Sequence, residues 1–278
     1  MGIFEGKCGL ILGVFNRQSI AWAIAEEIMR QGGQCGFSYL PDRPDAPRPK
    51  NRARVEKLIQ DQPAARFLHP MDVTRDEDID AFMQQAGEHF GRIDFLLHSI
   101  AFAPPEDLKR ETIDTSRQGF HTAMDISAYS LIAVVRAARE LFKESAAVLT
   151  MTYFGGEKAV PGYNVMGVCK AALEAIVRYL AFDLGPQGVR VNALSAGPLQ
   201  TISGRGAGVD RMLALYEAMA PLGRNITHEQ VGRVGAFLLS ELSDGITAEV
   251  LHLDCGYNAM GSPGRLLERL QHPESTAR

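Results

Sequence analysis

The sequence predicts an α/β fold, built as a single domain in which helices flank a doubly wound parallel sheet of seven strands. Short apolar and β-branched runs alternate with segments of helical periodicity, an order typical of parallel sheets. With 278 residues, 46% of them hydrophobic, the chain can bury the core of one such domain. The strand candidates are residues 8–14, 34–40, 66–69, 93–98, 148–152, 189–194 and 249–254.

The first strand candidate is followed by a glycine turn and a helix candidate. Gly13 ends the apolar run, and Ser19 is placed to cap a helix that starts at Ile20. A strand, a glycine turn and a helix amino end form a phosphate-binding cradle, because unpaired backbone N–H groups and the helix dipole attract an anion. The usual G-x-G-x-x-G spacing is absent, so an ordinary strand-to-helix connection is the alternative interpretation.

Helical patterns connect the later strand candidates. Residues 76–90 have the periodicity of an amphipathic helix, and residues 117–144 form a long helical region interrupted near residues 125–130. Residues 163–184 carry a broad apolar helical face that ends at a Gly-Pro pair. A capping box, Thr-His-Glu-Gln, predicts a further helix over residues 227–240.

Two phenols and one ammonium are placed where a single substrate could meet all three. Tyr153 directly follows the fifth strand candidate, and glycines and a proline mark a loop before the next helix. Tyr163 and Lys170 are seven residues apart, close to two helical turns, so they share one helix face. A nearby ammonium favours the ionised form of a phenol and strengthens it as a donor to a developing oxyanion. A surface tyrosine beside a solvated lysine is the alternative interpretation.

These residues also form a recognisable motif. Tyr163 and Lys170 make a Tyr-x6-Lys pair with a second tyrosine ten residues upstream, and Val-Arg-Val-Asn-Ala-Leu-Ser-Ala-Gly-Pro follows at residues 189–198. Together these motifs resemble the enoyl-[acyl-carrier-protein] reductase branch of the short-chain dehydrogenase/reductase family. The larger family more often has Tyr-x3-Lys with an upstream serine, whereas here Thr150 lies thirteen residues before Tyr163.

The resemblance implies NAD(P)H-dependent reduction of the trans-2 double bond of an enoyl thioester, carried by acyl carrier protein, in fatty-acid elongation. Hydride transfer to the β-carbon moves negative charge onto the thioester oxygen, to which Tyr163 would donate a hydrogen bond. By the same resemblance Lys170 would hold the nicotinamide ribose. Tyr153, Tyr163 and Ala103 would line the substrate pocket.

The resemblance also assigns cofactor contacts to residues near the strand ends. These positions are Gly13, Ser19, Ile20, Leu40, Asp72, Val73, Ser99, Ile100, Lys170, Leu199 and Thr201. NADH is the expected cofactor and NADPH is the alternative. Leu40, at the position of the ribose contact, cannot accept a hydrogen bond through its side chain. Residues 41–54 carry five basic residues and two acids, and the basic groups could bind the 2′-phosphate of NADPH. A solvated, proline-stiffened loop is the alternative interpretation.

Two parts of the chain after the sixth strand candidate depart from a compact pattern. Residues 202–210 hold three glycines, which predicts a mobile cover over the site, with an ordinary flexible loop as the alternative. The resemblance covers residues 6–256. It implies a Rossmann-like dinucleotide-binding and catalytic domain over residues 1–256 and a carboxyl-terminal tail over residues 257–278. Cys255 stands where the family usually has glycine, which leaves the path of the tail open.

Composition argues against several other classes of protein. A formal net charge of −4 provides no basic surface for nucleic acid, and no run of eighteen apolar residues is present to span a membrane. The first seven residues lack the organisation of a secretory signal, so the chain is expected in the cytoplasm. Four cysteines lack C-x2-C pairing and seven histidines lack metal-ligand spacing, so no metal site is predicted. Among the histidines, His98 is expected to pack in the core rather than bind a metal. The family resemblance also implies a homotetramer.

Two other functions stay open. A carbonyl-reducing member of the larger family, acting on 3-ketoacyl thioesters, would share the cofactor contacts but should carry the serine and Tyr-x3-Lys that this chain lacks. A non-catalytic dinucleotide sensor would need the fold but not Tyr163 and Lys170 on one helix face. Enoyl and 3-ketoacyl thioesters, compared as substrates, discriminate among the three functions.

Overall fold

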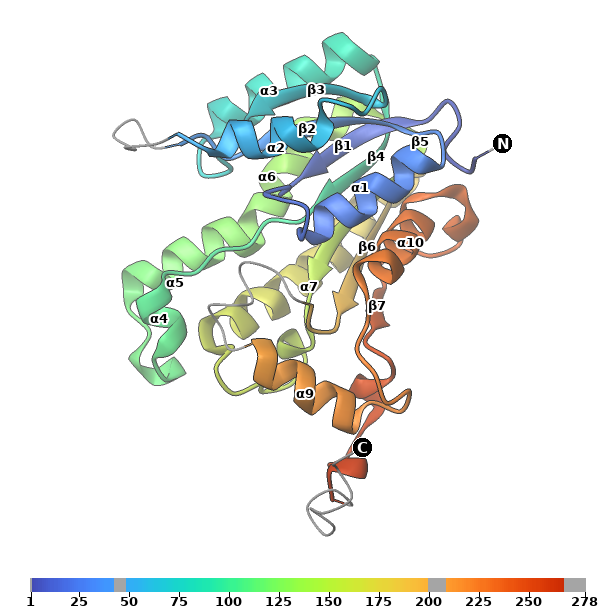
Figure 1. The fold of residues 1–278 in the computed structure, drawn as a ribbon. Coiled ribbons are helices and arrows are strands. Elements are labelled where there is room, and N and C mark those ends of the chain that lie inside the picture. The colour runs from blue at the N-terminus through green and yellow to red at the C-terminus, as the bar shows by residue number, and fades with distance from the viewer. Residues whose placement is uncertain (1, 43–48, 200–208, 268–278) are drawn as a thin grey trace.

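The computed structural model describes residues 2–42, 49–199 and 209–267, and within them seven parallel strands form one sheet (Figure 1). The strand order is β3-β2-β1-β4-β5-β6-β7. The strands are β1 Cys8–Leu12, β2 Gln34–Tyr39, β3 Ala65–Pro70, β4 Ile93–His98, β5 Phe142–Thr152, β6 Arg190–Ala196 and β7 Val250–Leu253. Each strand overlaps one of the predicted runs, and the predicted fold class is confirmed.

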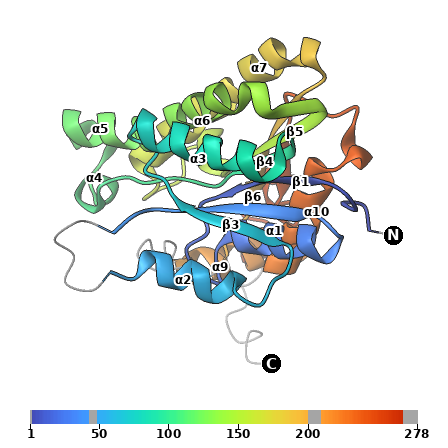
Figure 2. The same cartoon turned by 90° about the horizontal axis from the view of Figure 1, so that it is seen from above.

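Helices cover both faces of the sheet (Figure 2). One face is packed by α1 and α10, and the opposite face by α3, α6 and α7. The helices are α1 Ile20–Arg30, α2 Asn51–Ile59, α3 Asp76–Phe90, α4 Pro105–Lys109, α5 Arg117–Met124, α6 Ser130–Ala138, α7 Asn164–Leu184, α9 Val209–Met219 and α10 His228–Leu239. The prediction for residues 76–90 is therefore confirmed, and α7 begins one residue after its predicted start.

The strands divide their side chains between two hydrophobic cores. In β1, Leu10 and Leu12 belong to the core under α3, α6 and α7, whereas Ile11 belongs to the core under α1 and α10. This division follows from the geometry of a strand, because successive side chains point to opposite faces. Every residue of β6 is buried, as expected for an inner strand of a parallel sheet covered on both faces.

β5 is longer than predicted. It begins at Phe142, which pairs with Ile93 of β4, and the helical region that was predicted to reach residue 144 ends at Leu141. The register shifts between Ile93 and Phe95, and Ser145 has a positive φ of 68°. The prediction missed this segment because its polar residues, exposed at the amino end of the sheet, hide the strand pattern.

A π-helix, Asp125–Tyr129, joins α5 to α6 and confirms the predicted interruption. At its end the Ser130 hydroxyl donates to the Ile126 carbonyl over 2.7 Å. Within it the Ser127 hydroxyl both accepts from the Phe102 N–H and donates to the Phe102 carbonyl, each over 2.9 Å. The irregular turn therefore fastens the segment that follows β4, consistent with the frequent occurrence of π-bulges at functional sites.

Two predicted helix starts differ in how they are capped. Thr227 and Gln230 form the predicted capping box at α10, in which each side chain accepts a hydrogen bond from the other residue's backbone N–H. Ser19 occupies the cap position of α1, but its hydroxyl accepts from the N–H groups of Phe15 and Asn16, each at 3.0 Å. Ser19 therefore shapes the turn before the helix rather than satisfying the helix's own N–H groups.

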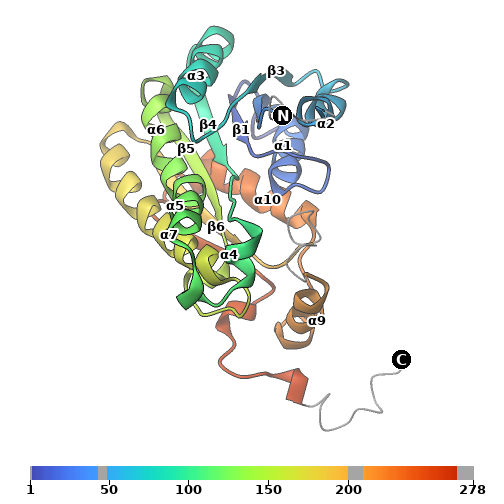
Figure 3. The ribbon, with the colours of Figure 1, turned by 90° about the vertical axis from the view of Figure 1, so that its left-hand side faces the viewer.

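α9 lies beyond the carboxyl ends of the strands, next to the last part of the described chain (Figures 1 and 3). The Arg265 guanidinium donates to the carbonyls of Ala220 and Pro221, over 3.0 and 2.9 Å, and so ties that part of the chain to the end of α9. Among the described helices, none combines the length and apolar character needed to cross a membrane.

Candidate active site

The residues predicted for the site gather at one edge of the sheet. Gly13 follows β1, Ser99 follows β4, Tyr153 follows β5 and Leu199 comes after β6. The carboxyl ends of parallel strands meet at one edge, and β1 lies between β2 and β4, where the strand order reverses. The structure thus brings together residues separated by more than a hundred positions. Thr201 and residues 202–208 of the predicted cover lie outside the described residues, and the last two residues of the cover, 209 and 210, belong to α9 rather than to a loop.

The turn after β1 requires glycine. Gly13 has a φ of +96°, and a Cβ at this position would lie 2.0 Å from the Ser99 carbonyl oxygen. The Ser99 N–H also donates to the Leu12 carbonyl over 3.1 Å, so the ends of β1 and β4 are held tightly together. The Ser19 hydroxyl accepts from the N–H groups of Phe15 and Asn16 and so shapes the turn that leads into the amino end of α1. This arrangement fits the pyrophosphate of a dinucleotide.

The adenosine side of this edge is largely apolar. Leu40 follows β2 with 57% of its surface exposed, and Val73 is buried. One Asp72 carboxylate oxygen accepts from both the backbone N–H and the hydroxyl of Thr74, over 3.0 and 2.8 Å. The residue that follows β2 is a leucine, whereas NAD-specific sites commonly have a carboxylate at this position.

The basic segment after β2 is only partly a loop. α2 begins at Asn51, so Arg52 and Arg54 lie on a helix, which corrects the prediction of a loop over residues 41–54. The Asp42 carboxylate accepts from the N–H groups of Lys50 and Asn51, each at 2.9 Å, and thereby caps α2. Arg43 and Arg48 lie outside the described residues.

The two predicted tyrosines touch each other. The rings of Tyr153 and Tyr163 meet edge to face, with centroids 4.8 Å apart and an interplanar angle of 68°. Gly155 makes room for this arrangement, since a Cβ there would lie 2.3 Å from the Tyr163 ring. Burial raises the pKa of Tyr153 to about 12, against a partly compensating hydrogen bond from Tyr216. Burial also raises the pKa of Tyr163. Both phenols are therefore protonated at neutral pH and can act as hydrogen-bond donors.

Lys170 lies two turns into α7, and only 5% of its surface is exposed. Its ammonium donates to the Met151 carbonyl of β5 over 2.8 Å. Burial lowers the pKa of Lys170 to about 8. The predicted effect of this ammonium on Tyr163 is wrong: burial, with Tyr153, Cys169 and Glu174 as the next causes, moves the Tyr163 pKa upward rather than downward. Lys170 therefore lies on the same side of α7 as Tyr163, but its ammonium is hydrogen-bonded to Met151 rather than to the phenol.

The segment after β4 closes one side of the site. Ile100 packs against the core under α3 and α6, and Ala103 packs against Ala123, Val165 and Cys169. His98, at the end of β4, is fully buried, as predicted for a packed residue. Its ring nitrogens lie 3.1 Å from the Thr150 hydroxyl and 2.9 Å from the Ser130 hydroxyl. Burial, reinforced by Lys170, lowers the pKa of His98 to about 3, so the ring is neutral.

Two residues near the site were not predicted. Glu174 lies one turn after Lys170 on α7 and accepts a hydrogen bond of 2.6 Å from the Thr152 hydroxyl, and burial raises its pKa. Its i+4 spacing from Lys170 is a signal that the sequence does contain. Tyr216 of α9 donates to the Tyr153 hydroxyl over 2.9 Å. No local sequence pattern connects these two tyrosines, because they are 63 residues apart.

Comparisons with known proteins place the chain among close relatives. Residues 13–258 match the family model described as Enoyl-(Acyl carrier protein) reductase. The Enoyl-[acyl-carrier-protein] reductase [NADH] FabI of Rickettsia felis is 43% identical over 94% of this chain and 98% of its own length. The Enoyl-[acyl-carrier-protein] reductase [NADPH] FabI of Staphylococcus aureus is 44% identical over 92% of this chain and 98% of its own. The solved structure of the Anaplasma phagocytophilum reductase in complex with NAD has a TM-score of 0.88 at 40% identity, covering 94% of this chain and 97% of that one.

Proposed function

The chain belongs to the enoyl-[acyl-carrier-protein] reductase family, and we propose that Tyr163, Tyr153 and Lys170 carry out its reaction, the NAD(P)H-dependent reduction of the trans-2 double bond of an enoyl thioester. Family, activity and nicotinamide cofactor agree with the prediction from the sequence. The observation that carries the assignment of residues is the contact between two protonated phenols at the end of β5, beside a buried lysine.

The bound nicotinamide supplies a hydride to the β-carbon of the substrate, which moves negative charge onto the thioester oxygen. Tyr163 donates a hydrogen bond to that oxygen and stabilises the enolate. Burial raises the pKa of Tyr163, so the phenol is protonated at neutral pH and meets the growing charge as a neutral donor. Protonation at the α-carbon completes the reduction.

Tyr153 forms the wall of the substrate pocket next to Tyr163. Tyr153 is 9% exposed and its ring packs edge to face against the Tyr163 ring, so it limits where the acyl chain can lie. Ala103, packed against the first turns of α7, contributes a small side chain to the same pocket. A small residue there leaves room for the acyl chain.

Lys170 binds the nicotinamide ribose and adds positive potential to the site. The bond to Met151 uses one of the three ammonium N–H groups and fixes the side chain against the end of β5. The two other N–H groups can then reach the ribose hydroxyls. A fixed ammonium loses less conformational freedom on binding than a solvated one.

The turn at Gly13 and Ser19, with Ile20 and Thr201, holds the pyrophosphate of the cofactor, and Leu199, Ser99 and Ile100 complete the nicotinamide side. Asp72 and Val73 contact the adenine. NADH is favoured over NADPH because of the family resemblance, although Leu40 and the basic residues that follow it depart from that pattern and relatives of similar identity are named for each cofactor. If the protein uses NADPH, the basic residues of α2 are the groups expected to bind its 2′-phosphate.

A direct assay tests the activity. The purified protein, supplied with NADH or NADPH, should reduce crotonyl thioesters of acyl carrier protein, followed by loss of dinucleotide absorbance at 340 nm. Acetoacetyl thioesters should be turned over far more slowly. Faster reduction of the ketoacyl substrate would instead assign the chain to the carbonyl-reducing members of the larger family, and no turnover of either would support a dinucleotide sensor.

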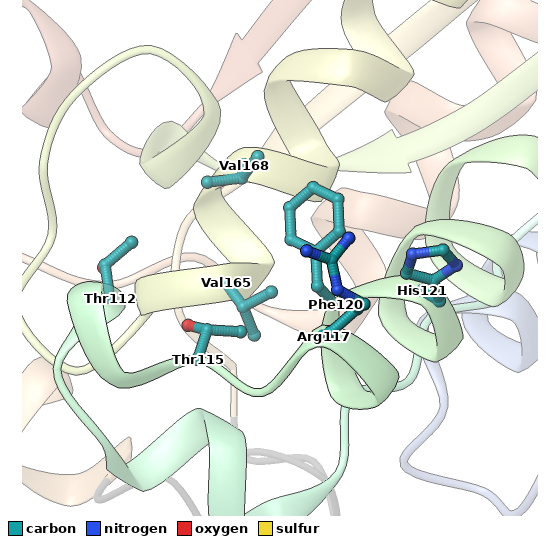
Figure 4. A pocket seen from close by; sticks show the side chains of 7 residues that line it. All are labelled: Thr112, Thr115, Arg117, Phe120, His121, Val165 and Val168. Atoms are coloured by element: carbon teal, nitrogen blue, oxygen red, sulfur yellow. The ribbon is translucent and has the colours of Figure 1, made fainter.

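The homotetramer implied by the family also has a candidate surface here. Val168, Tyr179 and Phe182 lie on one stripe of α7, and Tyr179 and Phe182 expose 73% and 81% of their surface. A cavity of about 450 Å³ extends this surface toward α5, between Val168 and Phe120 (Figure 4). Its lining also includes Thr112, Thr115, Arg117, His121 and Val165. A second copy of the chain is the proposed occupant, because a symmetric dimer places the same stripe on both partners.

Two further proposals concern the setting of the enzyme and its tail. The four cysteines are all free, which agrees with the proposed location in the reducing cytoplasm. Acyl carrier protein is the proposed carrier of the substrate. The catalytic domain is proposed to end at residue 256. The residues that follow form a tail whose described part contacts α9 through Tyr257 and Arg265.

A further inference from the structure

Tyr216 has no role in the reaction described above, yet it bonds directly to one of the residues assigned to the site. It projects from α9, is 4% exposed, and donates to the Tyr153 hydroxyl over 2.9 Å. A buried hydroxyl without a partner is costly, so this bond satisfies two polar groups at once. Because Tyr153 lies in the proposed substrate pocket, the same hydrogen bond can also affect how Tyr153 acts on the substrate.

The Tyr216 ring is held by a part of the chain that does not belong to β5 or α7. It stacks on Tyr257 with centroids 3.6 Å apart and an interplanar angle of 9°, and Phe154 meets Tyr257 edge to face at 5.7 Å. The Leu222 N–H donates to the Cys255 carbonyl over 3.3 Å, close to both rings in sequence. The Tyr216 ring is therefore held mainly by Tyr257, which follows β7, and Tyr257 in turn contacts Phe154, the residue after Tyr153.

The direction of the hydrogen bond decides what Tyr153 can still do. A phenol has one proton to donate, and the 2.9 Å contact allows Tyr216 to donate its proton to the Tyr153 oxygen. The Tyr153 proton remains available for a substrate. A hydroxyl that accepts a hydrogen bond is also polarised into a better donor. With Tyr216 as the donor, this bond lowers the pKa of Tyr153, whereas burial raises it. The other titratable groups that act on Tyr153 are Tyr257 and Asp254, both near the end of β7.

We propose that Tyr216 is a positioning residue for Tyr153, whose hydroxyl it fixes and polarises so that Tyr153 donates its own proton in a hydrogen bond to the enoyl thioester. The proposal rests on the assignment of Tyr153 to the substrate pocket. It makes α9, which carries Tyr216, part of what sets the geometry of the reaction. No proton is transferred between the two tyrosines in this arrangement.

The test is a double-mutant cycle of Tyr216→Phe and Tyr153→Phe. Tyr216→Phe keeps the ring that stacks on Tyr257 and removes only the hydroxyl. It should lower kcat for crotonyl-[acyl-carrier-protein] about fivefold, the effect of one hydrogen bond, without changing the affinity for the dinucleotide. In the Tyr153→Phe background the same change should have no further effect on kcat. Equal effects of Tyr216→Phe in both backgrounds would overturn the proposal and leave a packing role.

Tyr257→Phe is the matched control, because it removes a hydroxyl from the same stack of rings, and no described residue accepts from or donates to that hydroxyl. It should leave kcat within twofold of wild type. If Tyr216→Phe fails to fold, 3-fluorotyrosine at position 216 keeps ring and hydroxyl and makes the phenol a stronger donor. The proposal then requires that 3-fluorotyrosine changes kcat in the protein that has Tyr153 but not in Tyr153→Phe. An unchanged kcat in the protein that has Tyr153 would reject the proposal.

The outcome is separable from a failure of the assigned function. Absent reduction of crotonyl thioester by the wild type would refute the activity itself. Unchanged kcat and KM in Tyr153→Phe alone would refute the role of Tyr153, and with it the inference for Tyr216. Only a defective Tyr153→Phe combined with an additive Tyr216→Phe rejects the positioning role while leaving the function intact.

Discussion

The guanidinium carbon of Arg54 lies 4.5 Å from the centroid of the Phe15 ring. Phe15 belongs to the turn between Gly13 and Ser19, so this cation–π contact fixes a positive charge from α2 beside the proposed dinucleotide cradle. Arg54 is exposed, and its charge can still meet a 2′-phosphate there.

The first prediction concerns cofactor preference. The wild type should show higher kcat/KM with NADH, and its remaining NADPH activity should depend on Arg54. Arg54→Gln should lower kcat/KM for NADPH about tenfold, the usual effect of losing one charged hydrogen bond, with little change for NADH. Arg52→Gln is the control, because Arg52 lies on the same helix but faces Glu56 at 3.6 Å. Equal losses in both variants would indicate a general electrostatic effect rather than a phosphate contact.

Tyr163→Phe should lower the rate of enoyl reduction about a hundredfold, because the loss of one donor to a developing oxyanion costs roughly 3 kcal/mol. Dinucleotide affinity, measured by calorimetry, should change little. A turnover number equal to that of the wild type would remove Tyr163 from the reaction.

Lys170 should make cofactor binding and stability respond to pH in opposite directions. Its pKa is about 8 in the fold and 10.5 in an ordinary lysine, so between these values the unfolded chain binds more protons. The free energy of unfolding should therefore gain a rising contribution from pH 8 toward 10, as the buried charge is lost. Dinucleotide affinity should fall over the same range, since the neutral amine adds no positive potential. Lys170→Met should bind the cofactor more weakly and show neither trend, and wild-type affinity in this variant would refute the ribose assignment.

Gly13→Ala should abolish dinucleotide binding. The substitution combines an unfavourable positive φ with a Cβ only 2.0 Å from the Ser99 carbonyl, so the turn must move. Gly91→Ala is the matched control: Gly91 also has a positive φ, +67°, but a Cβ there meets no atom within 4 Å. Gly91→Ala should lose about 1 kcal/mol of stability to backbone strain and Gly13→Ala more, because of the clash with Ser99, and only Gly13→Ala should lose the cofactor. Normal cofactor affinity in Gly13→Ala would place the pyrophosphate elsewhere.

Phe182→Asp should weaken the assembly. Light scattering after size-exclusion chromatography should give a tetramer for the wild type and a smaller species for the variant, because a charge cannot be buried unpaired at an apolar interface. Leu242→Asp tests the same change at another exposed apolar residue, 65% exposed and outside α7, and should remain assembled. A monomeric wild type would reject the interface.

The sequence by itself determined the features that depend on short-range patterns. Alternating apolar runs predicted all seven strands, and the residues that follow them, such as Gly13 and Tyr153, necessarily reach the same sheet edge because the strands are parallel. The capping box at Thr227 and the interruption before Ser130 are also local signals, written within a few neighbouring residues. The start of β5 at Phe142 was missed, because polar residues interrupt its pattern.

The tertiary structure alone decided how the site residues are charged and paired. Burial depends on residues distant in sequence, and it moved the pKa of Tyr163 upward although the spacing to Lys170 suggested the reverse. The ammonium of Lys170 donates a hydrogen bond to the Met151 carbonyl of β5, and the Tyr153 hydroxyl is hydrogen-bonded to Tyr216 of α9. Such contacts join segments that meet only when the chain has folded, so no local pattern of residues encodes them.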